Sequence, residues 1–106
     1  MPSWLRKVLT RVRTLASARR VLFTLKARQE LACSGFGMDE EDAVEVLANL
    51  AAADSAGRLE SSATDESMYL FKPRAGKTPL YLKLILRDEC IVVSFHEDEG
   101  DTDEEE

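Results

Sequence analysis

The spacing of apolar residues changes along the chain, from a helical period in the first half to a strand period in the second. Between residues 3 and 16 the apolar positions recur three or four residues apart, which predicts an amphipathic helix with basic residues on its other face. Ser3 stands where an N-cap is expected. The apolar stripe consists of Trp4, Leu5, Val8, Leu9, Val12, Leu15 and Ala16.

Two further helices are expected in the first half, after a short apolar run at residues 21–23 that suits a brief strand. Thr24 can cap the second helix, which should end in the glycine-containing segment 34–37. Asp39 can cap the third helix, and the carboxylates that follow it favour the positive end of a helix dipole. They fan around one turn without converging, so capping and solvation explain them better than a magnesium site. The patterns comprise Leu25, Arg28, Leu31 and Ala32, then Val44, Leu47, Leu50 and Ala51.

Beyond a turn at residues 54–57 the apolar period becomes two. Residues 58–62 form a weak strand pattern, and residues 68–73 a stronger one. Pro73, Gly76 and Pro79 predict that residues 73–79 form a loop.

The clearest pattern is a hairpin of two strands, Leu80–Arg87 and Cys90–His96, joined by Asp88-Glu89. A two-residue connection places Tyr81 opposite His96. Because the connection lacks the glycine that a type I′ turn prefers, a slip of one residue in the loop stays open. The other expected pairs are Lys83 with Ser94, Ile85 with Val92 and Arg87 with Cys90.

Strand alternation sorts the hairpin into two faces. An apolar face, expected to pack on the helices, holds Leu82, Leu84, Leu86, Ile91, Val93 and Phe95. The other face, expected to be exposed, holds Tyr81, Lys83, Ile85, Arg87, Cys90, Val92, Ser94 and His96. The whole pattern predicts an α+β fold with three helices packed on one face of a small antiparallel sheet.

Charge is segregated along the chain. The net charge is −6, yet all 14 basic residues precede position 88, and residues 97–106 hold 8 of the 20 acidic ones. Residues 1–96 therefore carry 14 basic and 12 acidic residues, a net +2, which hints at nucleic-acid contact. We predict one domain over residues 1–96 and a disordered acidic tail over 97–106. The tail either solubilises the protein or competes with nucleic acid for the basic surface.

Several classes of protein fit the sequence poorly. No stretch approaches the roughly 18 apolar residues of a membrane span, and the arginine-rich start lacks the apolar core of a secretory signal, so we expect a cytoplasmic protein. Action of the first helix at a membrane surface is an alternative to burial of its stripe. Cys33 and Cys90 lack a metal-binding spacing and His96 is the only histidine, so we predict no metal and no cofactor.

The polar face of the hairpin groups a phenol, an imidazole and an ammonium. Cleavage of RNA requires a proton taken from the 2′-hydroxyl, a proton given to the 5′-oxygen, and charge stabilisation at phosphorus. His96 suits proton transfer because an unperturbed histidine has a pKa near 6.5, and Tyr81 can stack on a base or orient a phosphate. The alternative is that His96 is a solvated residue at a strand end. The candidates for phosphate binding are Lys72, Arg74, Lys77, Lys83 and Arg87.

Three segments of this region resemble the MqsR family, the ribonuclease toxins of bacterial type II toxin–antitoxin pairs. The family shows an aromatic-basic-Pro segment, then YLK, then a strand reading IVSF followed by a basic residue. The matching segments are Phe71-Lys72-Pro73-Arg74, Leu80-Tyr81-Leu82-Lys83 and Ile91-Val92-Val93-Ser94-Phe95. With the upstream order of elements, the resemblance covers about residues 5–97.

The resemblance implies a RelE-like fold, cleavage of mRNA without a metal, and inhibition by a cognate antitoxin. In the family, the tyrosine of YLK and the basic residue after VSF contribute to activity, at Tyr81 and His96 here. A lysine after a DS turn also contributes, and Arg58 is the nearest basic residue here. Met68 replaces a family glutamine. Two interpretations remain: an endoribonuclease toxin remodelled around histidine, or an MqsR-like module that binds a protein partner or RNA without cutting it.

Overall fold

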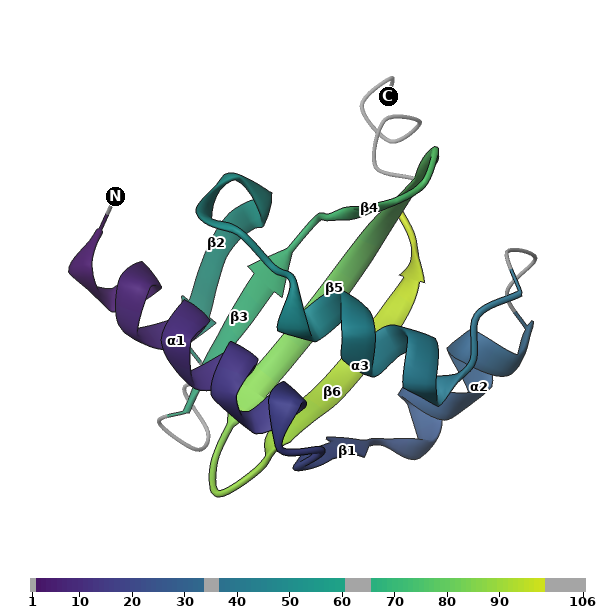
Figure 1. Cartoon of the computed structure of the whole chain (residues 1–106), viewed down its shortest axis with the longest axis horizontal. Coiled ribbons are helices and arrows are strands. Elements are labelled where there is room, and N and C mark those ends of the chain that lie inside the picture. Colours follow the sequence, from purple (N-terminus) through teal and green to yellow (C-terminus); the bar gives the residue numbers. More distant parts are fainter. Residues whose placement is uncertain (1, 34–36, 61–65, 99–106) are drawn as a thin grey trace.

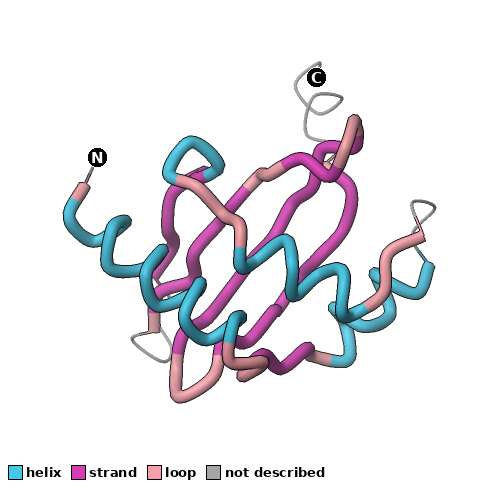
Figure 2. The backbone as a smooth tube through the Cα atoms, viewed as in Figure 1, coloured by secondary structure: helices cyan, strands magenta, loops and turns pink. Residues whose placement is uncertain are grey.

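The computed structural model describes residues 2–33, 37–60 and 66–98. Within these ranges the chain forms the elements shown in Figures 1 and 2. The helices are α1 (Ser3–Ser17), α2 (Leu25–Cys33), α3 (Glu40–Ala48) and the short 3-10 helix η1 (Ala52–Asp54). The strands are β1 (Val21–Phe23), β2 (Ser55–Glu60), β3 (Ser67–Phe71), β4 (Arg74–Ala75), β5 (Thr78–Leu86) and β6 (Cys90–Glu97).

The strands form one mixed sheet in the order β1-β6-β5-β3-β2, with β4 paired to β5. The fold is therefore α+β, as predicted. The expectation of a purely antiparallel sheet is wrong, because β1 runs parallel to β6 while the other pairs are antiparallel. Residues 24–89 separate the two strands, and a connection of that length allows parallel pairing.

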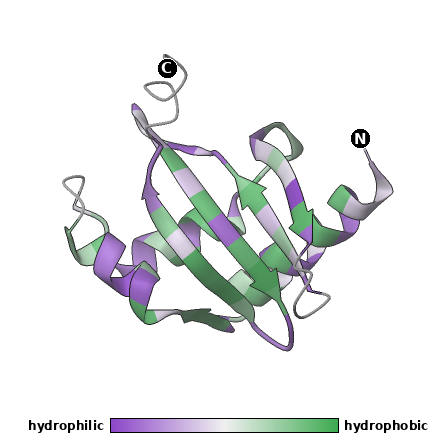
Figure 3. Ribbon diagram, turned by 180° about the vertical axis from the view of Figure 1, so that it is seen from behind, coloured by the Kyte–Doolittle hydropathy of each residue, from purple (hydrophilic) through white to green (hydrophobic). Residues whose placement is uncertain are grey.

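The helices take two positions relative to the sheet. Figure 1 shows α1 and α3 lying across one face, while α2 lies beside β6 at the sheet edge. Seen from behind in Figure 3, the opposite face has no described helix across its central strands. This uncovered side is the open face. Two of the three helices expected on one face, α1 and α3, lie there. The third, α2, packs instead along the edge of β6 where β1, only three residues long, has ended.

The core lies between α1, α3 and the sheet. The α1 stripe is buried except for Trp4, which is half-buried. Full burial of one leucine or valine side chain of this stripe contributes about 1.5–3 kcal/mol. The stripe is therefore held in the core rather than offered to a membrane surface, and no described helix combines the length and hydropathy needed to cross a bilayer. The sheet contributes Phe71, Leu80, Leu82, Leu84, Cys90, Val92 and Phe95.

Of the three predicted caps, those of α2 and α3 are confirmed. The predicted cap Ser3 is wrong, because α1 begins at Ser3 itself and its N-cap position, Pro2, makes no side-chain hydrogen bond. The Ala27 N–H donates to Thr24 Oγ1 at 3.1 Å at the start of α2. At α3, the Asp42 N–H donates to Asp39 Oδ1 at 2.9 Å, and the Asp39 N–H donates back to Asp42 Oδ2 at 3.2 Å. The acidic first turn therefore serves as a capping box. Leu25 lies outside the core at 72% exposure, because α2 buries Ala27 and Leu31 instead.

The β5–β6 hairpin differs from the predicted one at two places that compensate each other. Leu86 pairs with Cys90, so the connection has three residues, 87–89, rather than two. Val93 is then an extra residue, because Leu84 pairs with Val92 and the next pair is Lys83 with Ser94. The longer connection shifts the register by one residue and this β-bulge shifts it back.

The consequences differ on the two sides of the bulge. Beyond it, Tyr81 lies opposite His96 and Lys83 opposite Ser94, as predicted. Before it, the predicted pairs of Ile85 with Val92 and of Arg87 with Cys90 are wrong, because Ile85 pairs with Ile91 and Arg87 lies in the connection.

The same shift exchanges the faces of four residues in β6. Cys90 and Val92 are 0% exposed in the core, whereas Ile91 and Val93 are half-buried. The sequence pattern placed these pairs the other way round, since a one-residue shift moves every side chain of a strand to its other face. Burial raises the pKa of the Cys90 thiol to about 12, while Cys33 is exposed.

β6 continues past His96. Glu97 pairs with Leu80, and the Asp98 N–H donates to the Pro79 carbonyl at 2.9 Å. These two residues, expected in the tail, belong to the folded part. The rest of the predicted tail, residues 99–106, lies outside the described residues, as do residues 61–62 of the predicted weak strand and residues 34–36.

Candidate active site

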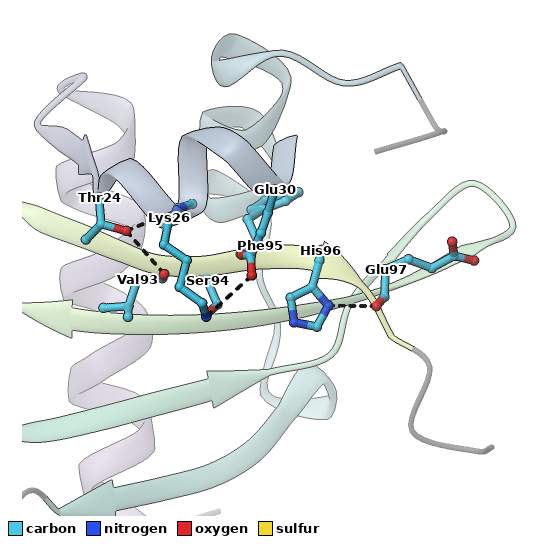
Figure 4. A network of polar contacts seen from close by, with 9 residues as sticks. Thr24, Lys26, Glu30, Val93, Ser94, Phe95, His96 and Glu97 are labelled. Carbon is cyan, nitrogen blue, oxygen red and sulfur yellow. Dashed lines mark hydrogen bonds and ion pairs between the residues drawn. The ribbon is translucent and has the colours of Figure 1, made fainter. Parts of the chain in front are cut away.

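Tyr81 and His96 lie side by side on the open face, from neighbouring strands. Their rings are stacked, with centroids 5.2 Å apart and planes inclined by 10°. His96 Nδ1 lies 2.8 Å from the carbonyl oxygen of Glu97. A dashed line joins the two residues in Figure 4. Because a carbonyl oxygen only accepts, this hydrogen bond requires a proton on Nδ1, which leaves Nε2 as the basic nitrogen of the ring.

Two lysine ammonium groups lie next to the pair of stacked rings. Lys83 lies two residues after Tyr81 on the same face of β5 and forms no ion pair with another described residue. Lys72 follows β3, and its Nζ lies 5.7 Å from the centroid of the Tyr81 ring. Tyr81, His96, Lys83 and Lys72 together form the open-face cluster.

Asp98 brings a negative charge to this cluster. Its Oδ2 lies 3.8 Å from Lys72 Nζ, and the two side chains are 19% and 44% exposed. A pair of this exposure contributes up to about 1 kcal/mol. Lys72 is therefore held between an aromatic ring and a carboxylate.

Residues 24–30, which comprise the cap and the first turns of α2, supply three polar side chains to β6 that the sequence did not place at the site. Thr24 Oγ1 donates to the Val93 carbonyl at 3.2 Å, and Lys26 Nζ donates to Ser94 Oγ at 2.7 Å (Figure 4). The Phe95 N–H donates to Glu30 Oε1 at 2.9 Å. The only local signal was the i,i+4 spacing of Lys26 and Glu30, which predicts their ion pair and not their contact with a distant strand.

Arg74 and Lys77 lie on the β4–β5 hairpin, which leads into the end of β5 that holds Tyr81. Arg74 Nη1 donates to the Lys77 carbonyl at 3.3 Å. The Arg74 side chain lines a pocket together with Asp42 and Glu45 of α3, so it lies toward the helix side of the sheet. Lys77 is exposed in the turn, where Gly76 adopts the left-handed conformation at φ 64°.

Arg87 lies at the other end of β5 from Tyr81. Six strand residues correspond to about 20 Å. The Arg87 guanidinium donates two hydrogen bonds to the Glu66 carboxylate, at 2.7 and 2.8 Å. This hydrogen bonding lowers the pKa of Glu66 and raises that of Arg87. Arg87 is thus ion-paired and remote from the cluster.

Arg58 lies on the helix side of the sheet. It pairs with Tyr69, which in turn pairs with the buried Leu84. The guanidinium carbon of Arg58 lies 4.9 Å from the centroid of the Trp4 ring, and Trp4 stacks on Tyr69. The structure therefore does not bring Arg58 to Tyr81 and His96.

Most of the chain matches one known protein family. Residues 6–97, which include the whole open-face cluster, match the family described as motility quorum-sensing regulator, toxin of MqsA. The chain belongs to the MqsR toxin family. Membership makes it a toxin of a toxin–antitoxin system, with an antitoxin as its partner. No curated protein matched the sequence.

The three segments that carry the MqsR resemblance meet at the open-face cluster. Lys72 comes from the aromatic-basic-Pro segment, Tyr81 and Lys83 come from YLK, and His96 follows the VSF strand. Met68, at the glutamine position of the MqsR pattern, pairs with Leu59 in the β2–β3 ladder.

This MqsR-family cluster has the groups that acid–base chemistry on a phosphodiester requires. The Nε2 atom of His96 can accept a proton, the phenol of Tyr81 can donate one, and the lysine ammonium groups can hold negative charge. Among the described residues, no three or more histidine, cysteine, aspartate or glutamate side chains are grouped so that they could hold a metal ion.

Proposed function

We propose that this chain is an endoribonuclease toxin with a RelE-like fold, an mRNA interferase that cleaves by acid–base catalysis without a metal cofactor. Membership of the MqsR family supports the toxin role. The stacking of His96 on Tyr81, at a centroid distance of 5.2 Å, carries the catalytic part of the proposal. The substrate is mRNA, so we place the activity in the cytoplasm.

The proposed reaction assigns one step to each group. His96 Nε2 takes the proton of the 2′-hydroxyl, and the 2′-oxygen forms a bond to phosphorus. The bond from phosphorus to the 5′-oxygen breaks, and the Tyr81 hydroxyl gives a proton to that leaving oxygen. Lys83 stabilises the negative charge that builds up on the phosphoryl oxygens. The products are a 2′,3′-cyclic phosphate and a 5′-hydroxyl end.

Lys72 acts as a phosphate contact beside the reacting group. Its position next to the Tyr81 ring places a positive charge at the edge of the cluster. Arg74 and Arg87 contribute at most long-range attraction of RNA, because Arg74 lies toward the helix side of the sheet and Arg87 at the other end of β5. Lys77, exposed in the β4–β5 turn, stays a proposed phosphate contact. Arg58 is left out of the reaction because it lies on the helix side of the sheet.

The test uses the purified protein, free of antitoxin, and a labelled RNA. We expect fragments that end in a cyclic phosphate, formed equally well in the presence of a metal chelator. His96→Ala should remain folded and leave the RNA intact. A substrate with a 2′-deoxynucleotide at the cut should resist cleavage. Intact RNA with the unaltered protein, together with normal growth on its expression, would refute the proposal in favour of a binding module.

The cognate antitoxin is tested separately. We expect a small neighbouring reading frame, co-expressed with this chain, to restore growth and to suppress RNA cleavage by direct binding. Growth arrest that persists despite formation of a stable complex would contradict inhibition by this partner.

A further inference from the structure

Four consecutive residues of β6, Val92 to Phe95, are held by the segment 24–30. The Thr24 N–H donates to the Val92 carbonyl at 3.1 Å, and Thr24 Oγ1 donates to the Val93 carbonyl at 3.2 Å. The contacts of Lys26 with Ser94 and of Glu30 with the Phe95 N–H complete the series (Figure 4). β1 pairs with β6 only as far as Val92, and residues 24–30 therefore take the place of a neighbouring strand along the next part of β6.

This held stretch contains the bulge that decides where His96 lies. The pairs nearest the connection are Leu86 with Cys90, Ile85 with Ile91 and Leu84 with Val92. Continued without the bulge, that register would set Tyr81 opposite Phe95 and would turn His96 toward the helices. The extra residue Val93 restores the pair of Tyr81 with His96.

Glu30 has the central place in this arrangement. Its carboxylate accepts the Phe95 N–H, one residue before His96 and two after the bulge. Lys26 Nζ lies 3.4 Å from Glu30 Oε2 and also donates to Ser94 Oγ, so the same ion pair reaches two adjacent residues of β6. The Glu30 side chain is 22% exposed, and this partial burial makes its hydrogen bond stronger than one fully in water.

We infer that Glu30 is a positioning residue for His96: its hydrogen bond to the Phe95 N–H keeps the bulge in β6 and with it the stacking of His96 on Tyr81. The positioning follows from the geometry alone. Its effect on catalysis rests on the proposed function.

Proton NMR of the imidazole of His96 tests the positioning without any RNA. His96 is the only histidine of the chain, so its two carbon-bound ring protons are identified directly. In the unaltered protein the stacked Tyr81 ring should shift them upfield, and Tyr81→Leu should remove that shift. We expect Glu30→Leu to remove it as well. Glu30→Gln, whose amide oxygen still accepts the Phe95 N–H, should retain it.

Glu45→Leu is the matched control, since it removes an exposed glutamate from α3. It should leave the His96 signals unchanged. A folded Glu30→Leu protein whose His96 ring protons keep the upfield shift of the unaltered protein would overturn the inference. If that variant does not fold, hydrogen exchange in the unaltered protein decides: the Phe95 amide should exchange slowly, and an amide that exchanges as fast as one in free solvent would equally overturn it.

The catalytic consequence is measured on the same variants. Misplacement of a reacting group by about 1 Å can cost a hundredfold in rate. We expect Glu30→Leu to lower kcat by about that factor with KM unchanged, and Glu30→Gln to recover most of the loss. If the unaltered protein does not cleave RNA, the proposed function fails while the NMR comparison still decides the role of Glu30.

Discussion

The imidazole of His96 is stacked on the phenol ring of Tyr81, with 5.2 Å between centroids and 10° between planes. The rings come from adjacent strands and meet only because a bulge in β6 restores their register. Stacking of this kind holds each ring in place through the other. The ring of Tyr81 and its hydroxyl therefore have separate roles, which two substitutions can distinguish.

Tyr81→Phe should retain the stacking on His96 and abolish RNA cleavage. We expect the variant to unfold at the temperature of the unaltered protein and to retain the upfield His96 signals, because stacking needs no hydroxyl. RNA cleavage and growth arrest should be lost, since no phenol donates a proton to the leaving oxygen. Tyr81→Leu should lose both activity and stacking. Full toxicity of Tyr81→Phe would show that the hydroxyl takes no part.

Lys83 should contribute to RNA binding where Arg87 does not. Measured in a His96→Ala background to prevent cleavage, Lys83→Gln should weaken binding and reduce the slope of log K against log salt by about 0.7, the value for one phosphate contact on a single strand. Arg87→Gln is the control, because Arg87 is already paired with Glu66. Equal losses in both variants would mean that only net charge matters.

Asp98 should oppose RNA binding through Lys72. Removal of its charge in Asp98→Asn frees Lys72 from a contact of 3.8 Å. Because an exposed ion pair is worth about 0.2–1 kcal/mol, we expect RNA affinity at low salt to rise by up to about fivefold. Glu97→Gln, which removes an exposed charge next to it, serves as the comparison. An affinity gain that is the same in both variants would assign the effect to general repulsion.

Arg58 should stabilise the fold and leave cleavage unchanged. Its guanidinium lies over the Trp4 ring at 4.9 Å on the helix side of the sheet. Loss of such a cation–π contact in Arg58→Ala should cost about 0.5–1 kcal/mol in urea unfolding. Arg58→Lys should retain part of that contribution. A folded Arg58→Ala protein of unchanged stability but without activity would instead make Arg58 part of the site.

The two cysteines should differ in reactivity. At pH 8 a thiol reagent should modify only the exposed Cys33 in the folded protein, and both cysteines after unfolding, because burial raises the pKa of Cys90 to about 12. The folded state holds the Cys90 proton more tightly than the unfolded chain, whose thiols titrate near 8.5. Stability should therefore fall as pH rises above about 8.5, and by less in Cys90→Ala. Rapid labelling of two thiols in the folded protein would contradict this burial.

The α1 helix was predictable because its stripe repeats with the helical period and one face must be buried. The caps Thr24 and Asp39 were predictable for a similar local reason, since each capping side chain bonds within three residues of itself. The parallel pairing of β1 with β6 was not, because the partner of a three-residue strand is decided by packing far away in the chain. The contacts of Lys26 and Glu30 with β6 were not predictable either, because they also join residues far apart in the chain.

In the β5–β6 hairpin, one part of the sequence-based prediction was right and another part was wrong. Alternation in the sequence was enough to predict two paired strands and to place Tyr81 beside His96, because two errors of one residue cancelled beyond the bulge. Between the connection and the bulge they did not cancel, and Cys90 and Val92 were assigned to the wrong face. The family motifs were also readable, since Lys72, Tyr81, Lys83 and His96 stand in recognisable segments.

By itself, the sequence determined the helices, the hairpin, the α+β class and the pairing of Tyr81 with His96. Each of these depends on periodicity or on side chains close together in the chain. Only the tertiary structure decided the bulge at Val93, the helix-side position of Arg58 and the hold of Glu30 on the strand before His96. A bulge costs one ladder position, and it is retained where distant groups bind the backbone that it releases. Here those groups lie on α2 and on its cap Thr24, more than sixty residues earlier in the chain.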